Sequence, residues 1–328
     1  MRGIIRRRPL ISYVVLATVL CSLSIVWQVV LSIRNPGLLR MIPDYLKWLE
    51  LNHLYTNAVT IGRFGFDGHP AAFLIFLFSG APTLAAIAVS AAAWGRSGVA
   101  KLFSRFKPWG DSRDRNRALK AYALLLAGYA FGIAVHLYLV HGRGAAAWTL
   151  AIGNLGGSWL LLPVFALVGA FIDEGGAFEE LGWRGFMLPI LQEKLASPLK
   201  ATMVLSLVWW GWHLPRDIPD LLTGSRGLID YLESQVTFFT LIVALAVLAT
   251  NFVNMTGGSV LPAIMIHSGT NLWSKALDVG VVHHGAWLGD ARTYIVYAFA
   301  VVTLIVAGPC LSYDKGGTGS RLNPVVGE

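Results

Sequence analysis

Three groups of polar side chains lie within or beside strongly apolar stretches of this sequence, and together they could do chemistry. They are Glu179, Glu180 and Arg184 in the first group, His213 in the second, and His267 and Asn271 in the third. An ionisable side chain at the centre of a bilayer costs about 2.5 to 3.5 kcal/mol on insertion scales, so such residues in a membrane are functional candidates by default. A carboxylate and two imidazoles are sufficient to activate and position a water molecule.

The adjacent glutamates of the first group are expected to have different roles. On a helix, Glu180 and Arg184 are four residues apart and can pair, whereas Glu179 points about 100° away and is left without a local partner. A carboxylate removed from water without a partner is a stronger proton acceptor. We therefore predict Glu179 as a general base and Glu180 with Arg184 as a supporting pair. The alternative is that both glutamates anchor the helix at the membrane interface.

The two histidine groups permit more than one interpretation each. His213 ends an aromatic-rich stretch, and Trp209 shares its helical face, so it could be catalytic or simply packed at the interface. His267 and Asn271 lie one helical turn apart on the same face. Two hydrogen-bond donors held in this way can stabilise an oxyanion, although hydrogen bonding between helices is a rival explanation.

Two hydrolytic chemistries fit these residues. One is direct general-base hydrolysis, with Glu179 activating a water that His213 orients. The other uses a zinc ion held by the carboxylate and the imidazoles, although the sequence contains no His-Glu-x-x-His pair. The cysteines, Cys21 and Cys310, lie in apolar stretches near opposite ends and predict neither a disulfide framework nor a cysteine metal cluster.

The composition places the elements that position these residues in a membrane. The chain has 328 residues, of which 55% are hydrophobic and 13% charged, and its mean hydropathy is +0.60. This polar content is too low for a soluble enzyme or a disordered chain. The formal net charge is +8, but the basic residues lie between hydrophobic runs, where they set topology, so we predict no nucleic-acid partner.

We predict an all-α polytopic membrane protein with about eight spans around an intramembrane cavity, because a span needs about 20 mostly apolar residues. The fourth span is broken by Gly175 and Gly176, and the fifth is short. Such irregular backbone is tolerated in a membrane only where protein buries it or it lines a cavity. The predicted spans are residues 10–33, 70–94, 118–140, 148–191, 199–214, 236–255, 260–279 and 294–311.

The basic residues predict the orientation. Arginines precede the first span and a basic loop separates the second from the third, which places both termini in the cytoplasm under the positive-inside rule. We expect one transmembrane domain over residues 1–312, with its motif-bearing part at 175–275, and a flexible cytoplasmic tail at 313–328. Two amphipathic stretches, 42–50 and 99–107, are expected to lie on the bilayer surface; the alternative is a solvated loop.

The order and spacing of the three groups resemble the CAAX protease and bacteriocin-processing family of intramembrane endopeptidases. The local sequences around the three groups also resemble those of the family. They are Glu-Glu-Leu-Gly-Trp-Arg-Gly at 179–185, Trp-His-Leu-Pro at 212–215, and Asn-Met-Thr-Gly-Gly-Ser at 254–259 ahead of His267. The resemblance covers most of residues 70–280 in layout. One departure is Trp209, because the family usually has phenylalanine four residues before the histidine of its second motif.

The resemblance implies a bundle of eight helices and a glutamate-dependent protease without a metal cofactor. Glu179 would activate water, His213 would help to hold it, and His267 with Asn271 would stabilise the tetrahedral oxyanion. Eukaryotic relatives remove the last three residues of prenylated CAAX proteins, whereas bacterial relatives are tied to bacteriocin processing and immunity. The expected partners are the lipid bilayer and a peptide or lipidated protein, and the expected location is a bacterial inner membrane.

Two readings from other functional classes remain open. A transporter or channel could use the intramembrane glutamate and histidine residues as a proton or cation path. A non-catalytic scaffold could bind a membrane partner through the same pocket. The sequence does not specify the substrate or the oligomeric state.

Overall fold

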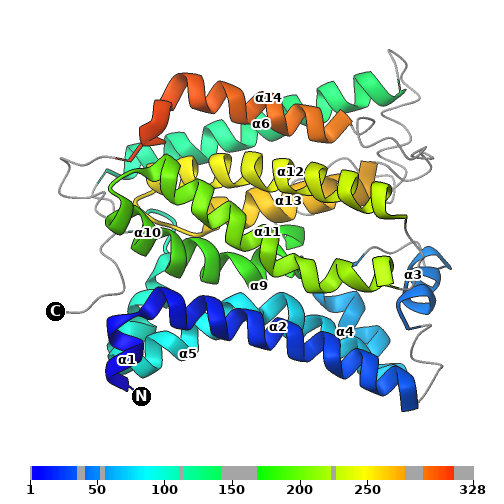
Figure 1. The fold of residues 1–328 in the computed structure, drawn as a ribbon. Coiled ribbons are helices and arrows are strands. Elements are labelled where there is room, and N and C mark those ends of the chain that lie inside the picture. The colour runs from blue at the N-terminus through cyan, green and yellow to red at the C-terminus, as the bar shows by residue number, and fades with distance from the viewer. Residues whose placement is uncertain are drawn as a thin grey trace.

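The computed structural model describes residues 2–34, 41–51, 56–110, 114–141, 168–222, 227–277 and 291–313 (Figure 1). Every regular element in these ranges is helical, which confirms the predicted all-α class. The longer helices are α2 (Pro9–Arg34), α5 (Phe73–Phe103), α6 (Arg115–His141), α11 (Pro198–Leu222), α12 (Leu228–Met255), α13 (Leu261–Leu277) and α14 (Ala291–Ala307). The shorter ones are α1 (Arg2–Arg7), α3 (Met41–Leu51), α4 (Ala58–Phe66), α9 (Gly176–Glu180) and α10 (Leu188–Leu195).

Five described helical segments are long and apolar enough to cross a membrane, so the chain is a polytopic membrane protein. They are Pro9–Trp27, Pro70–Phe106, Arg115–His136, Leu228–Met255 and Ala291–Cys310. The remaining predicted spans correspond to the segment α9 to α10, to α11 and to α13. These three segments carry the polar residues singled out above, which lower their hydropathy. Eight spans therefore remain a prediction, and most of residues 148–191, the fourth span, lies outside the described residues.

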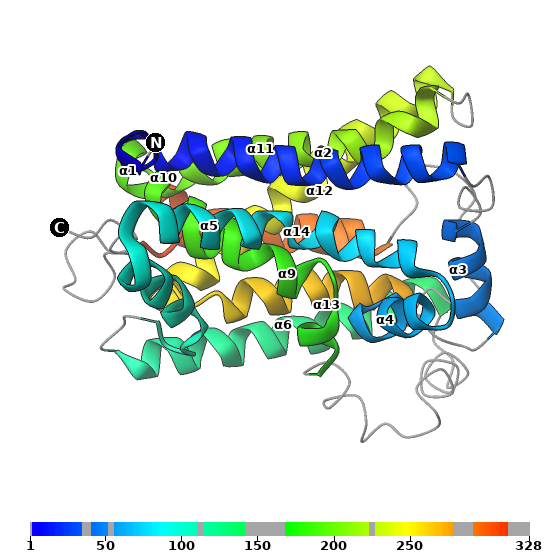
Figure 2. The ribbon, with the colours of Figure 1, turned by 90° about the horizontal axis from the view of Figure 1, so that it is seen from below.

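The helices lie in layers along a common direction. In Figure 1, α6 and α14 form the upper layer, α2 and α5 the lower one, and α10 to α13 lie between them. Figure 2 shows the short helix α9 near the middle of the bundle, where it contacts α5 on one side and α13 on the other. The polar residues on α9 and α13 are thus carried into the interior of the protein.

Small residues allow this central segment to approach its neighbours closely, as is common between membrane helices. A Cβ atom added at Gly176 would lie 2.0 Å from the Ser268 hydroxyl of α13, and one added at Gly182 would lie 2.5 Å from the Pro82 backbone of α5. Aromatic side chains fill the space around them; for example, the Trp183 and Trp212 rings meet edge to face at 5.7 Å.

Helices α1 and α10 lie at the same end of the bundle (Figure 1), and both carry basic residues in their last turn, Arg6 and Arg7 in α1 and Lys194 in α10. The Arg117 guanidinium at the start of α6 donates a hydrogen bond to the Ser312 carbonyl just after α14. The two stretches expected on the bilayer surface are largely helical, but part of each predicted lipid face is buried within the protein. Tyr45 and Leu49 of α3 are buried in a hydrophobic cluster with α4. In the second stretch, Leu102 and Arg105 are buried, whereas Phe103 is exposed. Packing within the protein takes up Tyr45 and Leu49 of the first stretch and Leu102 of the second, whereas Phe103 stays available to a bilayer surface.

Candidate functional site

A cavity of about 280 Å³ brings residues from six helices together, namely α5, α9, α11, α12, α13 and α14. It is lined by the four predicted catalytic residues: Glu179, His213, His267 and Asn271. Glu179 comes from α9, His213 from α11, and the other two from α13. Glu180 and Arg184 do not line this cavity but lie buried behind it. The structure therefore places all six predicted residues in one region, the four catalytic candidates at the cavity and the supporting pair behind it.

An irregular backbone positions the two glutamates. The helical backbone is interrupted at residues 173–175, and the short helix α9 then passes directly into a π-helical segment, η4 (Leu181–Met187). π-Helical segments are rare and are found frequently at functional sites. The interruption lies where the glycine pair predicted a break, and it turns Glu179 and Glu180 towards α11 and α13.

Glu179 is held by two neutral donors. It is 3% exposed, and its Oε2 atom accepts hydrogen bonds from the indole N–H groups of Trp183 at 3.1 Å and Trp209 at 2.9 Å. The expectation that Glu179 has no local partner is therefore wrong. That expectation considered only charged partners, whereas Trp183 lies one helical turn onward, within reach of the carboxylate. Because an indole nitrogen is only a donor, both bonds fix the carboxylate without neutralising it.

The Glu180 carboxylate connects Arg184, its partner in the supporting pair, with His267 of α13. Its Oε1 atom accepts hydrogen bonds from Arg184 Nη1 at 2.8 Å and from His267 Nδ1 at 2.9 Å. The predicted pairing of Glu180 with Arg184 is confirmed, and both residues are almost fully buried. The Arg184 guanidinium also lies over the Trp209 ring, 4.4 Å from its centroid. Breaking such a buried pair is costly because it leaves an uncompensated charge.

The hydrogen bond of His213 determines which of its nitrogens faces a reactant. Nδ1 lies 2.9 Å from the Trp209 carbonyl oxygen. A carbonyl can only accept, so Nδ1 carries a proton in this pair, and Nε2 of the neutral ring is an acceptor. His213 is buried among aromatic rings, including Trp212 with a centroid distance of 4.7 Å. The ring is therefore fixed with one basic nitrogen remaining for the cavity.

The side-chain nitrogens of His267 and Asn271 both lie next to the space that a side chain at position 175 would occupy, which Gly175 leaves empty. A Cβ atom added at Gly175 would lie 3.0 Å from both His267 Nε2 and Asn271 Nδ2. Glycine at this position therefore leaves room for a small group that two nitrogens could contact at once. Asp173 fixes the amide, because its Oδ2 atom accepts hydrogen bonds from Asn271 Nδ2 at 3.0 Å and from the Gly176 backbone N–H at 2.9 Å.

Several residues of the site were not found by sequence reasoning. Asp173 and Trp183 contact the predicted residues directly, and Glu174, Arg216 and Arg292 line the cavity. Asp173 and Glu174 adjoin the glycine pair that predicted the break, so their place in the sequence was a usable signal. Arg292 lies at the start of α14, and no spacing to the other groups indicated it.

The donor set does not form a metal site in the described part of the chain. No group of three or more His, Cys, Asp or Glu side chains converges there in a way that could hold a metal ion. The first predicted ligand, Glu179, is instead hydrogen-bonded to two tryptophans, and His213 lies among aromatic rings.

Comparisons with known proteins match the same part of the chain. Residues 155–273 match the family described as type II CAAX prenyl endopeptidase Rce1-like. A curated relative, "CAAX prenyl protease 2" from Methanococcus maripaludis, is 27% identical over 124 residues, which is 37% of this chain and 45% of the relative. The match thus spans just under half of that relative. No solved structure gives a significant match. These matches confirm the resemblance to the CAAX prenyl endopeptidases over the part of the chain that carries the polar groups.

Proposed function

We propose that this protein is an intramembrane endopeptidase that hydrolyses a peptide bond with water activated by Glu179. The observation that carries the proposal is the convergence of Glu179, His213, His267 and Asn271 on one cavity inside a membrane-spanning helical chain. The similarity to CAAX prenyl endopeptidases over residues 155–273 supports the same reaction class.

The reaction begins with a water molecule between Glu179 and His213. The indole bonds occupy Oε2 of Glu179, so Oε1 is the oxygen that accepts the proton of this water. Nε2 of His213 accepts the second hydrogen bond of the same water and orients it. The resulting hydroxide attacks the peptide carbonyl carbon. The C–N bond of the tetrahedral intermediate then breaks as Glu179 returns the proton to the departing nitrogen, which leaves an amine and a carboxylic acid that loses its proton to water on release.

The developing oxyanion is placed between His267 and Asn271. Their Nε2 and Nδ2 atoms flank the space above Gly175, and donors aimed at such a position in a dry site stabilise the tetrahedral intermediate strongly. For Nε2 to donate while Nδ1 donates to Glu180, His267 must carry both protons. Glu180 then balances this imidazolium, and the supporting pair with Arg184 keeps the carboxylate in place.

The substrate in this proposal is a membrane-associated peptide that is hydrophobic or prenylated. Its apolar part would meet the aromatic side of the cavity, where Phe78, Phe238 and Trp209 contribute to the lining. Trp209 and Trp212 are buried within the protein, so the aromatic residues of α11 do not all face lipid. We also propose a bacterial cytoplasmic membrane with both termini inside, because the basic residues of α1, α10 and the start of α6 lie at one end of the bundle.

The test uses the purified full chain in detergent with fluorogenic peptides that end in a free carboxylate, each made with and without a farnesyl group. Mass spectrometry of the products identifies the bond that is cut. We expect cleavage of the farnesylated peptide, faster than of its unmodified twin, and unchanged rates after treatment with a strong chelator. Loss of activity with chelator and recovery with zinc would contradict the metal-free mechanism. Absence of cleavage for every peptide, together with proton-coupled flux in liposomes, would favour a transporter.

A further inference from the structure

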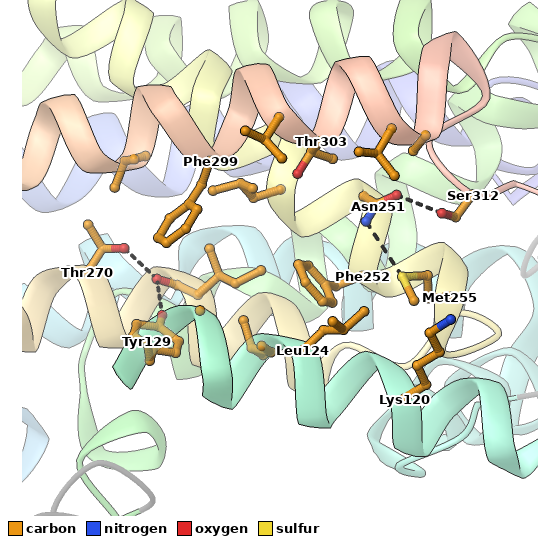
Figure 3. Close-up of a pocket in the computed structure, with 18 residues that line it drawn as sticks. Lys120, Leu124, Tyr129, Asn251, Phe252, Met255, Thr270, Phe299, Thr303 and Ser312 are labelled. Carbon is orange, nitrogen blue, oxygen red and sulfur yellow. Dashed lines mark hydrogen bonds between the residues drawn. The ribbon is translucent and has the colours of Figure 1, made fainter. Parts of the chain in front are cut away.

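A second cavity, of about 460 Å³, is lined by none of the four catalytic candidates and lies between α6 and α14, with residues of α12 and α13 also in its lining (Figure 3). We refer to it as the lateral groove. One end is marked by Lys120, Met255 and Ser312, and the other by Tyr129 and Thr270. Along α6, Lys120 and Tyr129 are nine residues apart, which corresponds to about 13 Å at the rise of an α-helix.

The walls of the lateral groove suit a hydrocarbon chain. The side chains between its two ends are mostly aliphatic or aromatic, and they include Leu124, Phe252 and Phe299. At the far end, the Tyr129 hydroxyl donates to the Met265 carbonyl at 2.6 Å, and the Thr270 hydroxyl donates to the Ile266 carbonyl at 2.7 Å. Both hydroxyl protons are therefore used within the protein, so this end needs no polar group from an occupant.

The groove is open at its side to the surroundings of the protein. Leu124, Val302 and Val306, which contribute to its lining, are 49%, 55% and 81% exposed. They belong to α6 and α14, which are both candidate membrane spans. The medium beside these residues is consequently the bilayer, and a lipid chain can enter the groove sideways without crossing a polar barrier.

Among the described residues that line the groove, Lys120 is the one cationic side chain, and it lies at one end of the groove. Lys120 is exposed and makes no hydrogen bond or ion pair within the described ranges, and its side chain is drawn without a partner in Figure 3. Arg115 and Arg117 lie on the preceding turns of α6, at the basic end of the bundle. A basic cluster at the membrane surface attracts anionic headgroups.

We propose that the lateral groove binds one acyl chain of an anionic phospholipid, whose phosphate pairs with Lys120. The apolar walls account for the chain, the side opening accounts for its entry, and the cation at the basic end selects the headgroup. This binding site does not depend on the proposed peptidase activity.

The groove also shares a wall with the catalytic cavity. Thr270 lines both cavities, and it lies on α13 between His267 and Asn271. A lipid chain in the groove fills the space behind this turn of α13 and so holds the two oxyanion donors in place. Bound lipid should therefore raise the peptidase rate, and this consequence does rest on the proposed function.

The test uses the full chain in detergent with an equimolar mixture of phosphatidylglycerol and phosphatidylcholine that have identical acyl chains. Native mass spectrometry counts the lipid retained. The variant Lys120→Gln removes the cation, and Gly128→Leu fills the groove, because a Cβ atom at Gly128 meets nothing within 4 Å. Matched controls are Lys194→Gln, an exposed lysine of α10, and Gly62→Leu, where a Cβ atom is equally unobstructed.

We expect the wild type and both controls to retain one phosphatidylglycerol in preference to phosphatidylcholine, by about fivefold for one lysine at an anionic surface. Lys120→Gln should abolish this preference, and Gly128→Leu should abolish retention of both lipids while its unfolding temperature stays within the range of the controls. Equal retention of both lipids by the wild type would overturn the headgroup assignment. Retention that survives in Gly128→Leu would overturn the groove.

A second readout separates this proposal from the peptidase. Cleavage in phosphatidylglycerol bilayers should exceed cleavage in phosphatidylcholine bilayers for the wild type, and the difference should vanish in Gly128→Leu. A protein that retains phosphatidylglycerol but cleaves no peptide would contradict the proposed function and leave the lipid site intact. A protein that retains a farnesylated peptide and no phospholipid would assign the groove to the lipid of a substrate, against this proposal.

Discussion

Replacing Gly175 by alanine should remove activity while leaving the fold intact. The methyl group would occupy the space in which the oxyanion is proposed to form, 3.0 Å from both His267 Nε2 and Asn271 Nδ2 and 3.3 Å from Asp173 Oδ2. Carbon at 3.0 Å from these nitrogens replaces a hydrogen-bond acceptor with an apolar group. A substrate carbonyl would then be displaced from both donors at once.

The magnitude follows from the two donors and from the backbone of Gly175. Removing one oxyanion-hole donor typically costs about 10²- to 10³-fold in kcat, so displacement from two donors should cost at least about 100-fold. The backbone itself favours the change, because Gly175 has φ −75° and ψ −68°, a region open to alanine.

The assay is the kcat for cleavage of the farnesylated reporter, measured beside thermal unfolding in the same detergent. The matched control is Gly211→Ala on α11, since a Cβ atom there meets nothing within 4 Å. Gly211→Ala should keep the rate and the unfolding temperature of the wild type. A Gly175→Ala protein that is folded and retains a kcat within threefold of the wild type would refute the proposed position of the oxyanion.

The remaining predictions concern the residues that hold the site. Trp209→Phe removes an indole donor to the base, and we expect kcat to fall about 10- to 100-fold with an unchanged KM, since a hydrogen bond to a charged group contributes about 1.5 to 3 kcal/mol; an equal fall in Trp210→Phe would contradict this. Asp173→Ala frees the amide of the oxyanion pair and should lower kcat at least about tenfold, given the same contribution of about 1.5 kcal/mol or more for a hydrogen bond to a charged group; unaltered kinetics would exclude the positioning role. Arg184→Gln breaks a buried pair and should destabilise the protein by about 3 to 5 kcal/mol, measured as a lower unfolding temperature. The exposed ion pair at Arg63 is the control, and Arg63→Gln should cost at most about 1 kcal/mol.

Much of the fold could be predicted because hydropathy fixes which segments enter a membrane. The helices α2, α5, α6, α12 and α14 lie where apolar runs predicted spans. The surface stretches were predicted less well, because amphipathic periodicity shows that one face is apolar but not what covers it. Tyr45, for example, packs against Phe64 of α4 with a centroid distance of 5.1 Å instead of facing lipid.

The three polar groups of the candidate site were predictable, whereas several of the residues that contact them were not. Glu180 and Arg184 were paired correctly because their spacing places them on the same helical face. The two indole donors to Glu179 were missed, since tryptophan in an apolar segment is usually read as packing. Trp209 could not have been assigned from spacing at all, because its bond to Glu179 joins residues 30 positions apart on different helices.

The departure of Trp209 from the usual phenylalanine also has a different meaning in three dimensions. From the sequence, the change is one aromatic residue in the place of another. The indole N–H instead bonds directly to the proposed base, and the ring face meets the Arg184 guanidinium. The substitution therefore adds a donor to the site as well as volume.

The central claim is that the Glu179 carboxylate activates the water, and the variant Glu179→Gln tests it most directly. Glutamine keeps the size of the side chain and an oxygen for the indole donors but cannot take the proton. The control is Glu193→Gln, an exposed glutamate of α10. We predict that Glu179→Gln folds, still binds the farnesylated reporter and does not cleave it, whereas Glu193→Gln cleaves at the wild-type rate. Cleavage by Glu179→Gln at a rate close to that of the wild type would contradict the mechanism.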